Sequence, residues 1–185
     1  MSGPSTRPGE SGAATGNDAA PTGTNEVVVI RAADAETLGS PTIQVRLLAD
    51  SSATGGALST QRVTMAEGAD GATPHLHRMS SELFYVLSGS ADVLTGDRVI
   101  TANEGDLVVV PPETPHAFAA SPGHSADLLI VITPGVERFE YFRHLGRIAT
   151  GAATAESLLE LQDHYDTQFL VSPPWRAARA KPTTP

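Results

Sequence analysis

Three histidines and one glutamate have the residue types and the spacing of a metal-binding site. His75 and His77 are two residues apart. Because successive side chains on a strand alternate between faces, these two imidazoles point the same way if the segment is extended. Glu82 and His116 each adjoin an apolar run from which they can join the pair on neighbouring strands. Three imidazoles and one carboxylate at one point form a site for a divalent transition metal.

The donor set indicates an open metal site, although a single histidine in a β protein is more often a hydrogen-bonded core residue. Closed structural zinc sites favour cysteine, and this chain has none. Four protein ligands on a six-coordinate ion would leave two positions for a substrate or dioxygen. One divalent ion of Fe, Mn, Ni, Co or Zn suits three histidines and a glutamate, so the sequence leaves the metal open.

Two stretches of the chain, 74–89 and 105–116, resemble the paired motifs of the cupin family. The first motif is His-x-His, three or four residues, Glu, six residues and Gly, and it is matched by His75, His77, Glu82 and Gly89. The second is Gly, five residues, Pro-x-Gly, two residues, His, three residues and Asn, and it is matched by Gly105, Pro111 and His116.

This resemblance covers residues 40–135 and implies a metal ligand set of His75, His77, Glu82 and His116. The chain departs from the second motif at two positions. Glu113 stands where the family has Gly, and Ala120 where it has Asn. The motif pair is more specific than an isolated His-x-His.

Short apolar runs separated by turn residues predict an all-β fold. We expect strands at 26–31, 42–48, 57–65, 82–87, 91–94, 99–101, 107–110, 117–120 and 127–133. Gly89 is expected to turn the chain between two of them, and the continuous run 107–110 to be buried on both faces. Without intervening helices the strands are expected to be antiparallel, and the cupin resemblance implies a jelly-roll β-barrel.

The segment after the barrel predicts one or two helices. The first is expected at 136–145 with Gly146 as its stop, and the second at 155–165 with Thr154 as its N-cap. Trp175 is expected to pack back on the fold. The domain organisation is therefore a disordered tail at 1–25, a barrel at 26–135 and a helical extension at 136–180 packed on the barrel.

A Pro-Gly-Val-Glu-Arg-Phe segment after the barrel, followed by helices and a Gln-x-x-Tyr-Asp-like stretch, resembles single-domain quercetinase-type cupins. That resemblance implies C-terminal elements near the barrel mouth and a metal-dependent dioxygenase for a small phenolic, flavonol-like or enediol substrate. Glu82 would be both ligand and catalytic base. The side chains expected to line the substrate pocket are Met65, Phe84, Val86 and Phe118.

Two other functional classes stay open. The same site could serve a metal-dependent isomerase, cyclase or dehydratase, or a small-molecule-binding protein without turnover. Oxygen consumption separates the dioxygenase from the other enzymes, and product formation separates both from the binding protein.

The composition favours a small-molecule substrate as the binding partner, and dioxygen is a candidate second substrate. A net charge of −9 argues against nucleic acid and anionic membranes, and no apolar run is long enough to span a bilayer. The absence of cysteine allows a reducing compartment, so we expect a cytoplasmic protein. The cupin resemblance implies a homodimer, for which the apolar segment 27–30 is a candidate contact. The remaining histidines, expected to face solvent or satisfy helix ends, are His124, His144 and His164.

Overall fold

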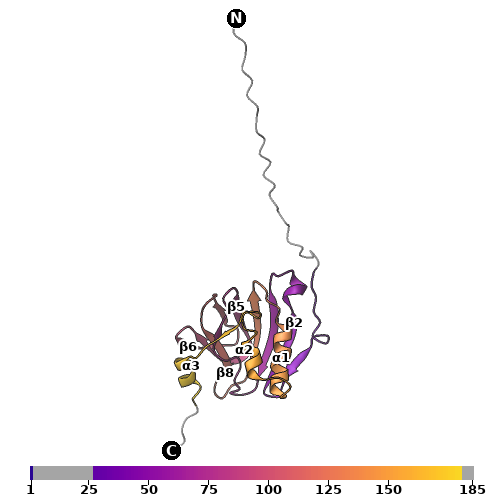
Figure 1. Ribbon diagram of the computed structural model, residues 1–185. Helices are drawn as coiled ribbons and strands as arrows, with labels where there is room; N and C mark the ends of the chain where they lie inside the picture. Colours follow the sequence, from indigo (N-terminus) through magenta and orange to yellow (C-terminus); the bar gives the residue numbers. More distant parts are fainter. Residues whose placement is uncertain (2–26, 181–185) are drawn as a thin grey trace, which may run out of the picture.

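Antiparallel strands followed by short helices form the described part of the chain (Figure 1). The computed structural model describes Met1 and residues 27–180, so the tail expected at 1–25 lies, apart from Met1, outside the described residues. The strands are β1 (Thr37–Gly39), β2 (Ile43–Ala49), β3 (Ser59–Met65), β4 (His75–Leu76), β5 (Ser81–Thr95), β6 (Arg98–Asn103), β7 (Leu107–Val110), β8 (His116–Ala120), β9 (Ala126–Thr133) and β10 (Gln168–Phe169). The helices are the 3-10 helix η1 (Ser51–Thr54) and the α-helices α1 (Phe139–Ala149), α2 (Ala155–Leu159) and α3 (Pro173–Ala178).

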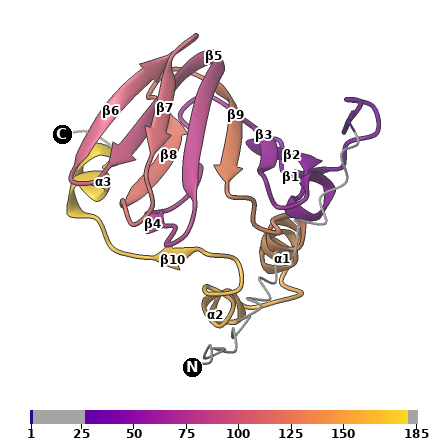
Figure 2. The ribbon, with the colours of Figure 1, turned by 90° about the horizontal axis from the view of Figure 1, so that it is seen from above.

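The strands curl into a jelly-roll half-barrel, which confirms the predicted fold class (Figure 2). Their order is β1-β2-β3-β9-β5-β8-β4-β10, with β6 and β7 also paired to β5. All the pairings are antiparallel. Figure 2 shows α1, α2 and β10 along one side of the half-barrel and α3 beside β6.

The long strand β5 connects the two halves of the sheet, where the sequence predicted two strands separated by a turn at Gly89. Its first half pairs with β7 and β9, and its second half pairs with β6 and β8. Gly89 has φ +78°, and a Cβ there would lie 2.0 Å from the Ser125 carbonyl oxygen. Glycine therefore bends the strand beside a bulge at 86–88 without ending it.

Side chains along the strands of the barrel alternate between its inside and its outside. Inward residues of β3, β5, β8 and β9 form one core cluster that includes Val63, Phe84, Phe118 and Leu128. The prediction that 107–110 is buried on both faces is wrong. Val110 is buried, but Leu107 and Val109 are 56% and 55% exposed, because β7 belongs to a single-layered wall whose outer face is uncovered.

The prediction of a first strand at 26–31 is also wrong for its described residues, 27–31. This segment has no strand pairing, its valines and Ile30 are exposed, and the sheet begins instead at β1. β-Branched residues favour extended backbone, but a strand also needs a neighbouring strand to accept its hydrogen bonds. The homodimer contact suggested for 27–30 stays a prediction.

The helices after the barrel differ in their limits from the predicted ones. Helix α1 passes through Gly146 and ends at Ala149, with Thr150 as its C-cap next to Gly151, which has φ +74°. Thr154 caps α2 as predicted, but the helix ends at Leu159. His144 is buried rather than solvated, because its Nε2 lies 2.8 Å from the Ser157 hydroxyl and thereby connects α1 with α2. His124 and His164 are exposed.

A third helix, α3, was not predicted, but Trp175 packs back as expected. The indole is buried in a cluster with Leu94, Ala117 and Ala119 on the barrel. Nearby, Arg179 donates hydrogen bonds to the carbonyl oxygens of Gly68 and Ala120. The end of the described chain is therefore attached to the wall formed by β5 and β8.

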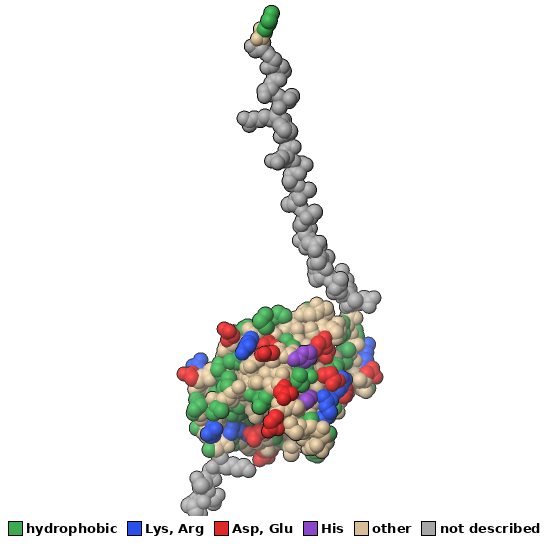
Figure 3. Space-filling model, viewed as in Figure 1, with side chains coloured by type: hydrophobic (Ala, Val, Ile, Leu, Met, Phe, Trp, Pro, Cys, Tyr) green, Lys and Arg blue, Asp and Glu red, His purple; other side chains and the backbone are tan. Residues whose placement is uncertain are grey.

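The surface seen in Figure 3 intersperses acidic and basic side chains with apolar ones. Among the described residues, no helix combines the length and apolar character needed to cross a bilayer.

Candidate metal centre

The strand pairing brings the four predicted ligands together. His75 on β4 lies directly opposite His116 on β8, and Glu82 is an inward residue near the start of β5. His77 follows β4 by one residue. One ligand atom from each side chain lies within 4.8 Å of all the others, and all four residues are buried. Glu82 Oε2 is 2.8 Å from His116 Nε2, 3.4 Å from His77 Nε2 and 3.9 Å from His75 Nε2.

Backbone carbonyls orient all three imidazoles in the same way. His75 Nδ1 is 2.8 Å from the Thr73 oxygen, and His116 Nδ1 is 2.8 Å from the Thr114 oxygen. His77 Nδ1 meets the carbonyl of Asp166. A carbonyl can only accept, so each Nδ1 carries the hydrogen, and each Nε2 of a neutral ring presents a lone pair to Glu82.

The inner atoms of this cluster lack partners. His77 Nε2, His116 Nε2 and Glu82 Oε2 are buried and have no hydrogen-bond partner among the described residues. Lone pairs on three ring nitrogens and a carboxylate oxygen repel one another unless a cation lies between them. Nitrogen and oxygen donors of this kind suit a divalent transition metal. The residues therefore fit the metal ion that the resemblance implies.

Burial and neighbouring charge set the protonation of the cluster. Burial, reinforced by the neighbouring His116, lowers the pKa of His75 well below 6.5, so this imidazole is neutral at pH 7. Burial alone would raise the pKa of Glu82, but His116 and His77 outweigh it and lower that pKa well below 4.5. A neutral imidazole and an ionised carboxylate are the forms that bind metal.

Asp166 positions the ligand loop from the far end of the chain. Its carbonyl holds His77, and its buried carboxylate accepts hydrogen bonds from three successive backbone N–H groups. These belong to Arg78 (2.7 Å), Met79 (3.0 Å) and Ser80 (3.2 Å). The loop between two ligands, His77 and Glu82, is thus shaped by one side chain. Sequence reasoning noted the Tyr-Asp pair but gave Asp166 no role.

In the turn before His116, Glu113 replaces the glycine of the cupin motif and adopts a backbone conformation that glycine favours. Glu113 has φ +60°, a left-handed conformation, and its N–H donates to the His77 carbonyl at 2.6 Å. This hydrogen bond connects the turn to the other ligand loop. A non-glycine residue in this conformation costs about 1–2 kcal/mol.

Glu113→Gly is expected to stabilise the protein by about 0.5–1 kcal/mol, because relief of the left-handed strain exceeds the added flexibility of the unfolded chain. Glu104→Gly is the matched control, since Glu104 is also an exposed glutamate in a turn but has no positive φ. Its substitution is expected to destabilise. Urea denaturation of the two variants checks both signs, and equal signs would contradict the strain at Glu113.

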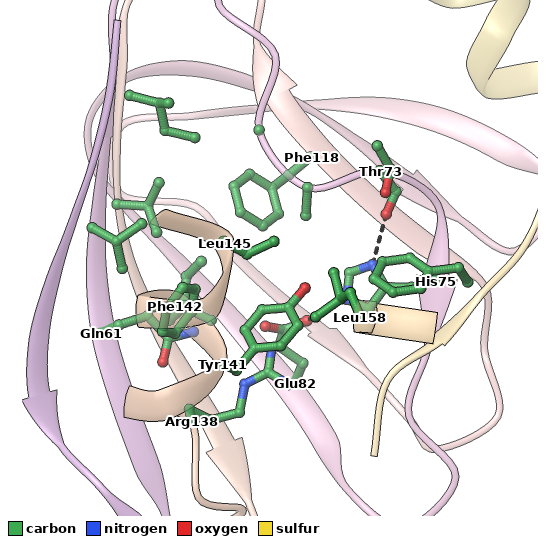
Figure 4. A pocket seen from close by; sticks show the side chains of 17 residues that line it. Gln61, Thr73, His75, Glu82, Phe118, Arg138, Tyr141, Phe142, Leu145 and Leu158 are labelled. Atoms are coloured by element: carbon green, nitrogen blue, oxygen red, sulfur yellow. Dashed lines mark hydrogen bonds and ion pairs between the residues drawn. The ribbon is translucent and has the colours of Figure 1, made fainter. Parts of the chain in front are cut away.

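The metal cluster borders a cavity of about 240 Å³ inside the barrel mouth (Figure 4). His75 and Glu82 line it, and α1, α2 and β10 contribute the opposite wall. Apart from these two ligands, the lining includes Ile43, Val45, Gln61, Val63, Phe118, Ile130, Arg138, Tyr141, Phe142, Leu145, Leu158 and Phe169. The C-terminal elements therefore lie at the barrel mouth, and most of the wall is apolar.

Only one of the four predicted pocket residues borders this cavity. Phe118 is part of its wall, whereas Met65, Phe84 and Val86 lie in the core cluster and do not line it. Strand parity correctly predicts that they point inward. Along β3 and β5, however, the cavity is reached by the preceding inward residues, Val63 and Glu82, so the next ones lie in the packed interior. Parity gives the face of a strand but not the depth at which a cavity lies.

Comparison with known families decides the relationship. The family model described as "Cupin domain" matches residues 61–133, which include all four residues of the cluster. Residues 61–133 therefore form a cupin domain. This cupin has the same fold as a point variant of Streptomyces PAC13 solved with uridine, with a TM-score of 0.50 and 18% identity over 61% of this chain and 86% of that one. An RmlC-like cupin from Shewanella frigidimarina gives a TM-score of 0.50 and 20% identity over 60% of this chain and 92% of that one.

A curated relative of this cupin is quercetin 2,3-dioxygenase of Bacillus subtilis. The two are 34% identical over 87 residues, which is 45% of this chain and 25% of the relative. This cupin thus matches about a quarter of the length of that protein. The two solved structures indicate the fold alone at their level of identity.

The cavity also has polar residues that were not predicted, among them Gln61, Arg138 and Tyr141. Arg138 and Tyr141 come from the Pro-Gly-Val-Glu-Arg-Phe segment and the helix after it, elements that the resemblance to quercetinase-type cupins implies near the mouth. The sequence signal that could have identified Arg138 is an arginine among aromatic residues. Only the fold reveals that these side chains share a wall with Glu82.

Proposed function

We propose that this cupin is a metal-dependent dioxygenase for a small phenolic or enediol substrate. The observation that carries the proposal is the position of Glu82, which belongs both to the metal-type cluster and to the wall of an apolar cavity. The local similarity to quercetin 2,3-dioxygenase supports it. A cavity of about 240 Å³ is smaller than the ~300–1,000 Å³ typical of drug-sized ligands, which favours a one-ring substrate over a flavonol.

The residues of this chain would divide the chemistry between them. A divalent metal held by His75, His77, His116 and Glu82 would act as a Lewis acid that lowers the pKa of a substrate hydroxyl. Glu82, ionised and facing the cavity, would accept that proton. Phe118, Phe142 and Leu158 would exclude water from the anion. Both atoms of dioxygen would enter the product, so dioxygen itself is the oxidant and no reductant is needed.

Turnover of phenols and enediols by metal-loaded protein, measured with an oxygen electrode and by product analysis, tests the proposal. Glu82→Gln is expected to lower the turnover rate about 10²–10⁴-fold, because the amide cannot accept the proton. Glu104→Gln makes the same change at an exposed turn and should leave the rate unaltered.

Equal product formation under nitrogen would exclude the dioxygenase and favour an isomerase, cyclase or dehydratase with the same site. Binding without any product, whichever of the five metals is loaded, would leave a small-molecule-binding protein.

A further inference from the structure

Arg138 is a buried cation on the wall of the cavity. It directly precedes α1, is 4% exposed and lines the same space as Glu82. Figure 4 shows its guanidinium beside Tyr141, whose ring centroid is 4.2 Å from the guanidinium carbon. This cation–π contact attracts the guanidinium to the ring and holds it against the wall.

The charge of Arg138 has no anionic partner. Among the described residues, no carboxylate oxygen lies within 4.0 Å of a guanidinium nitrogen of Arg138, although Asp50 accepts from its backbone N–H. Nη1 donates to two neutral groups, the Tyr165 carbonyl at 3.0 Å and the Thr167 hydroxyl at 2.6 Å. A buried charge without a counter-charge is costly.

One edge of the guanidinium remains available to a ligand. Nε is buried without a hydrogen-bond partner, and the hydrogen bonds to Tyr165 and Thr167 both come from Nη1. Nε–H and Nη2–H form the fork that binds a carboxylate with two parallel hydrogen bonds. Gln61, which lines the same cavity, also has a buried side-chain oxygen without a partner. Polar groups in an otherwise apolar wall typically orient a ligand.

Tyr141 connects this cation with the metal cluster. Burial raises the pKa of the Tyr141 hydroxyl, while the charge of Arg138 lowers it and that of Glu82 raises it. Arg138, Tyr141 and Glu82 line the same cavity, so a group held by Arg138 would share that space with Glu82.

We infer that Arg138 binds the carboxylate of the cavity's ligand, which is therefore a small monoanionic acid with an apolar or aromatic body. A phosphate dianion would bring more negative charge than one guanidinium neutralises. Naming this acid as the substrate rests on the proposed function, whereas its binding does not. The inference is therefore tested by affinity rather than by turnover.

The test uses matched acids and primary amides, which share their shape but not their charge. Zinc-loaded full-length protein is titrated calorimetrically under nitrogen with benzoate, 2-hydroxybenzoate, 4-hydroxybenzoate and 4-hydroxycinnamate, and with the amide of each. In at least one pair the acid is expected to bind about tenfold or more tightly than its amide. Arg138→Gln should bring that ratio to about one and change the amide affinity less than about threefold.

Two controls separate anion binding from other effects. Arg147→Gln removes an equal charge from a partly exposed position of α1 and should keep the ratio. Thr167→Ala removes a partner of Nη1 without removing the cation and should also keep it. Arg138→Lys retains the charge but not the fork, so the ratio should fall only partly. If Arg138→Gln does not fold, the Arg138→Lys variant provides the test instead.

Three results would overturn the inference. The first is the absence of acid preference in every pair. The second is a preference that survives in Arg138→Gln, which would assign the anion to the metal alone. The third is equal weakening of acid and amide in the Arg138 variants, as expected if Arg138 only holds the segment at 165–167. A missing oxygen requirement with intact acid binding would reject the dioxygenase and leave this inference standing.

Discussion

A His77→Ala substitution is expected to weaken metal binding by this cupin strongly. The His77 imidazole is buried, its Nδ1 is held by the Asp166 carbonyl, and its Nε2 faces Glu82 Oε2 at 3.4 Å. Loss of one of four ligands leaves the ion with a weaker and less complete donor set. We expect metal content after dialysis to fall about tenfold or more, and metal-dependent turnover to fall with it. Elemental analysis of purified protein provides the measurement.

His124→Ala is the matched control for this substitution. His124 is exposed in the loop between β8 and β9, and its Nδ1 interacts only with a nearby carbonyl, that of Pro122. Its loss should leave the metal content at the value of the unmodified protein. An equal loss in both variants would indicate non-specific surface binding. Retention of one ion per chain in His77→Ala would contradict the assignment of His77 as a ligand.

Replacing Asp166 with alanine will weaken the metal centre without removing a ligand side chain. Three backbone N–H groups between His77 and Glu82 lose their acceptor, although the carbonyl that holds His77 remains. Hydrogen bonds to a charged acceptor contribute ~1.5–3 kcal/mol each, and part of this returns when water reaches the loop, so unfolding should become about 2–4 kcal/mol easier. Metal affinity should fall about 10–100-fold.

The neighbouring Asp163→Ala controls for charge and sequence position. Its carboxylate is 83% exposed and forms a solvent-exposed ion pair with Arg78, which contributes ~0–1 kcal/mol. Chelator competition should give it the metal affinity of the unmodified protein. Asp166→Asn retains one acceptor and tolerates the left-handed backbone at this position, so it should fall between the two. A wild-type affinity for Asp166→Ala would show that the loop keeps its shape unaided.

The sequence by itself determined the four candidate metal ligands and an all-β antiparallel fold, and the cupin resemblance added the jelly-roll topology. His75 and His77 are separated by the two-residue period of a strand, and the apolar runs around Glu82 and His116 report which faces are buried. Such patterns are visible locally because each side chain must suit the buried or exposed strand face on which it lies. The two motifs therefore predicted four side chains that the fold brings within 4.8 Å.

The sequence did not predict elements whose structure depends on residues far away in the chain. Residues 27–30 have the composition of a strand but no neighbouring strand, and Gly89 bends a strand that was expected to end. Gly146 was expected to stop α1, yet the helix continues because its packed face outweighs the cost of about 1 kcal/mol for an internal glycine.

Only the tertiary structure decided what surrounds the metal ligands. Asp166 lies 89 residues from His77 and Arg138 lies 56 residues from Glu82, separations over which no local pattern operates. Their roles follow from which atoms are left without partners once the C-terminal segment closes over the barrel mouth. The depth of a cavity along a strand is likewise set by packing between elements. For this reason inward-facing Phe84 belongs to the core while Glu82, two residues earlier, faces the cavity.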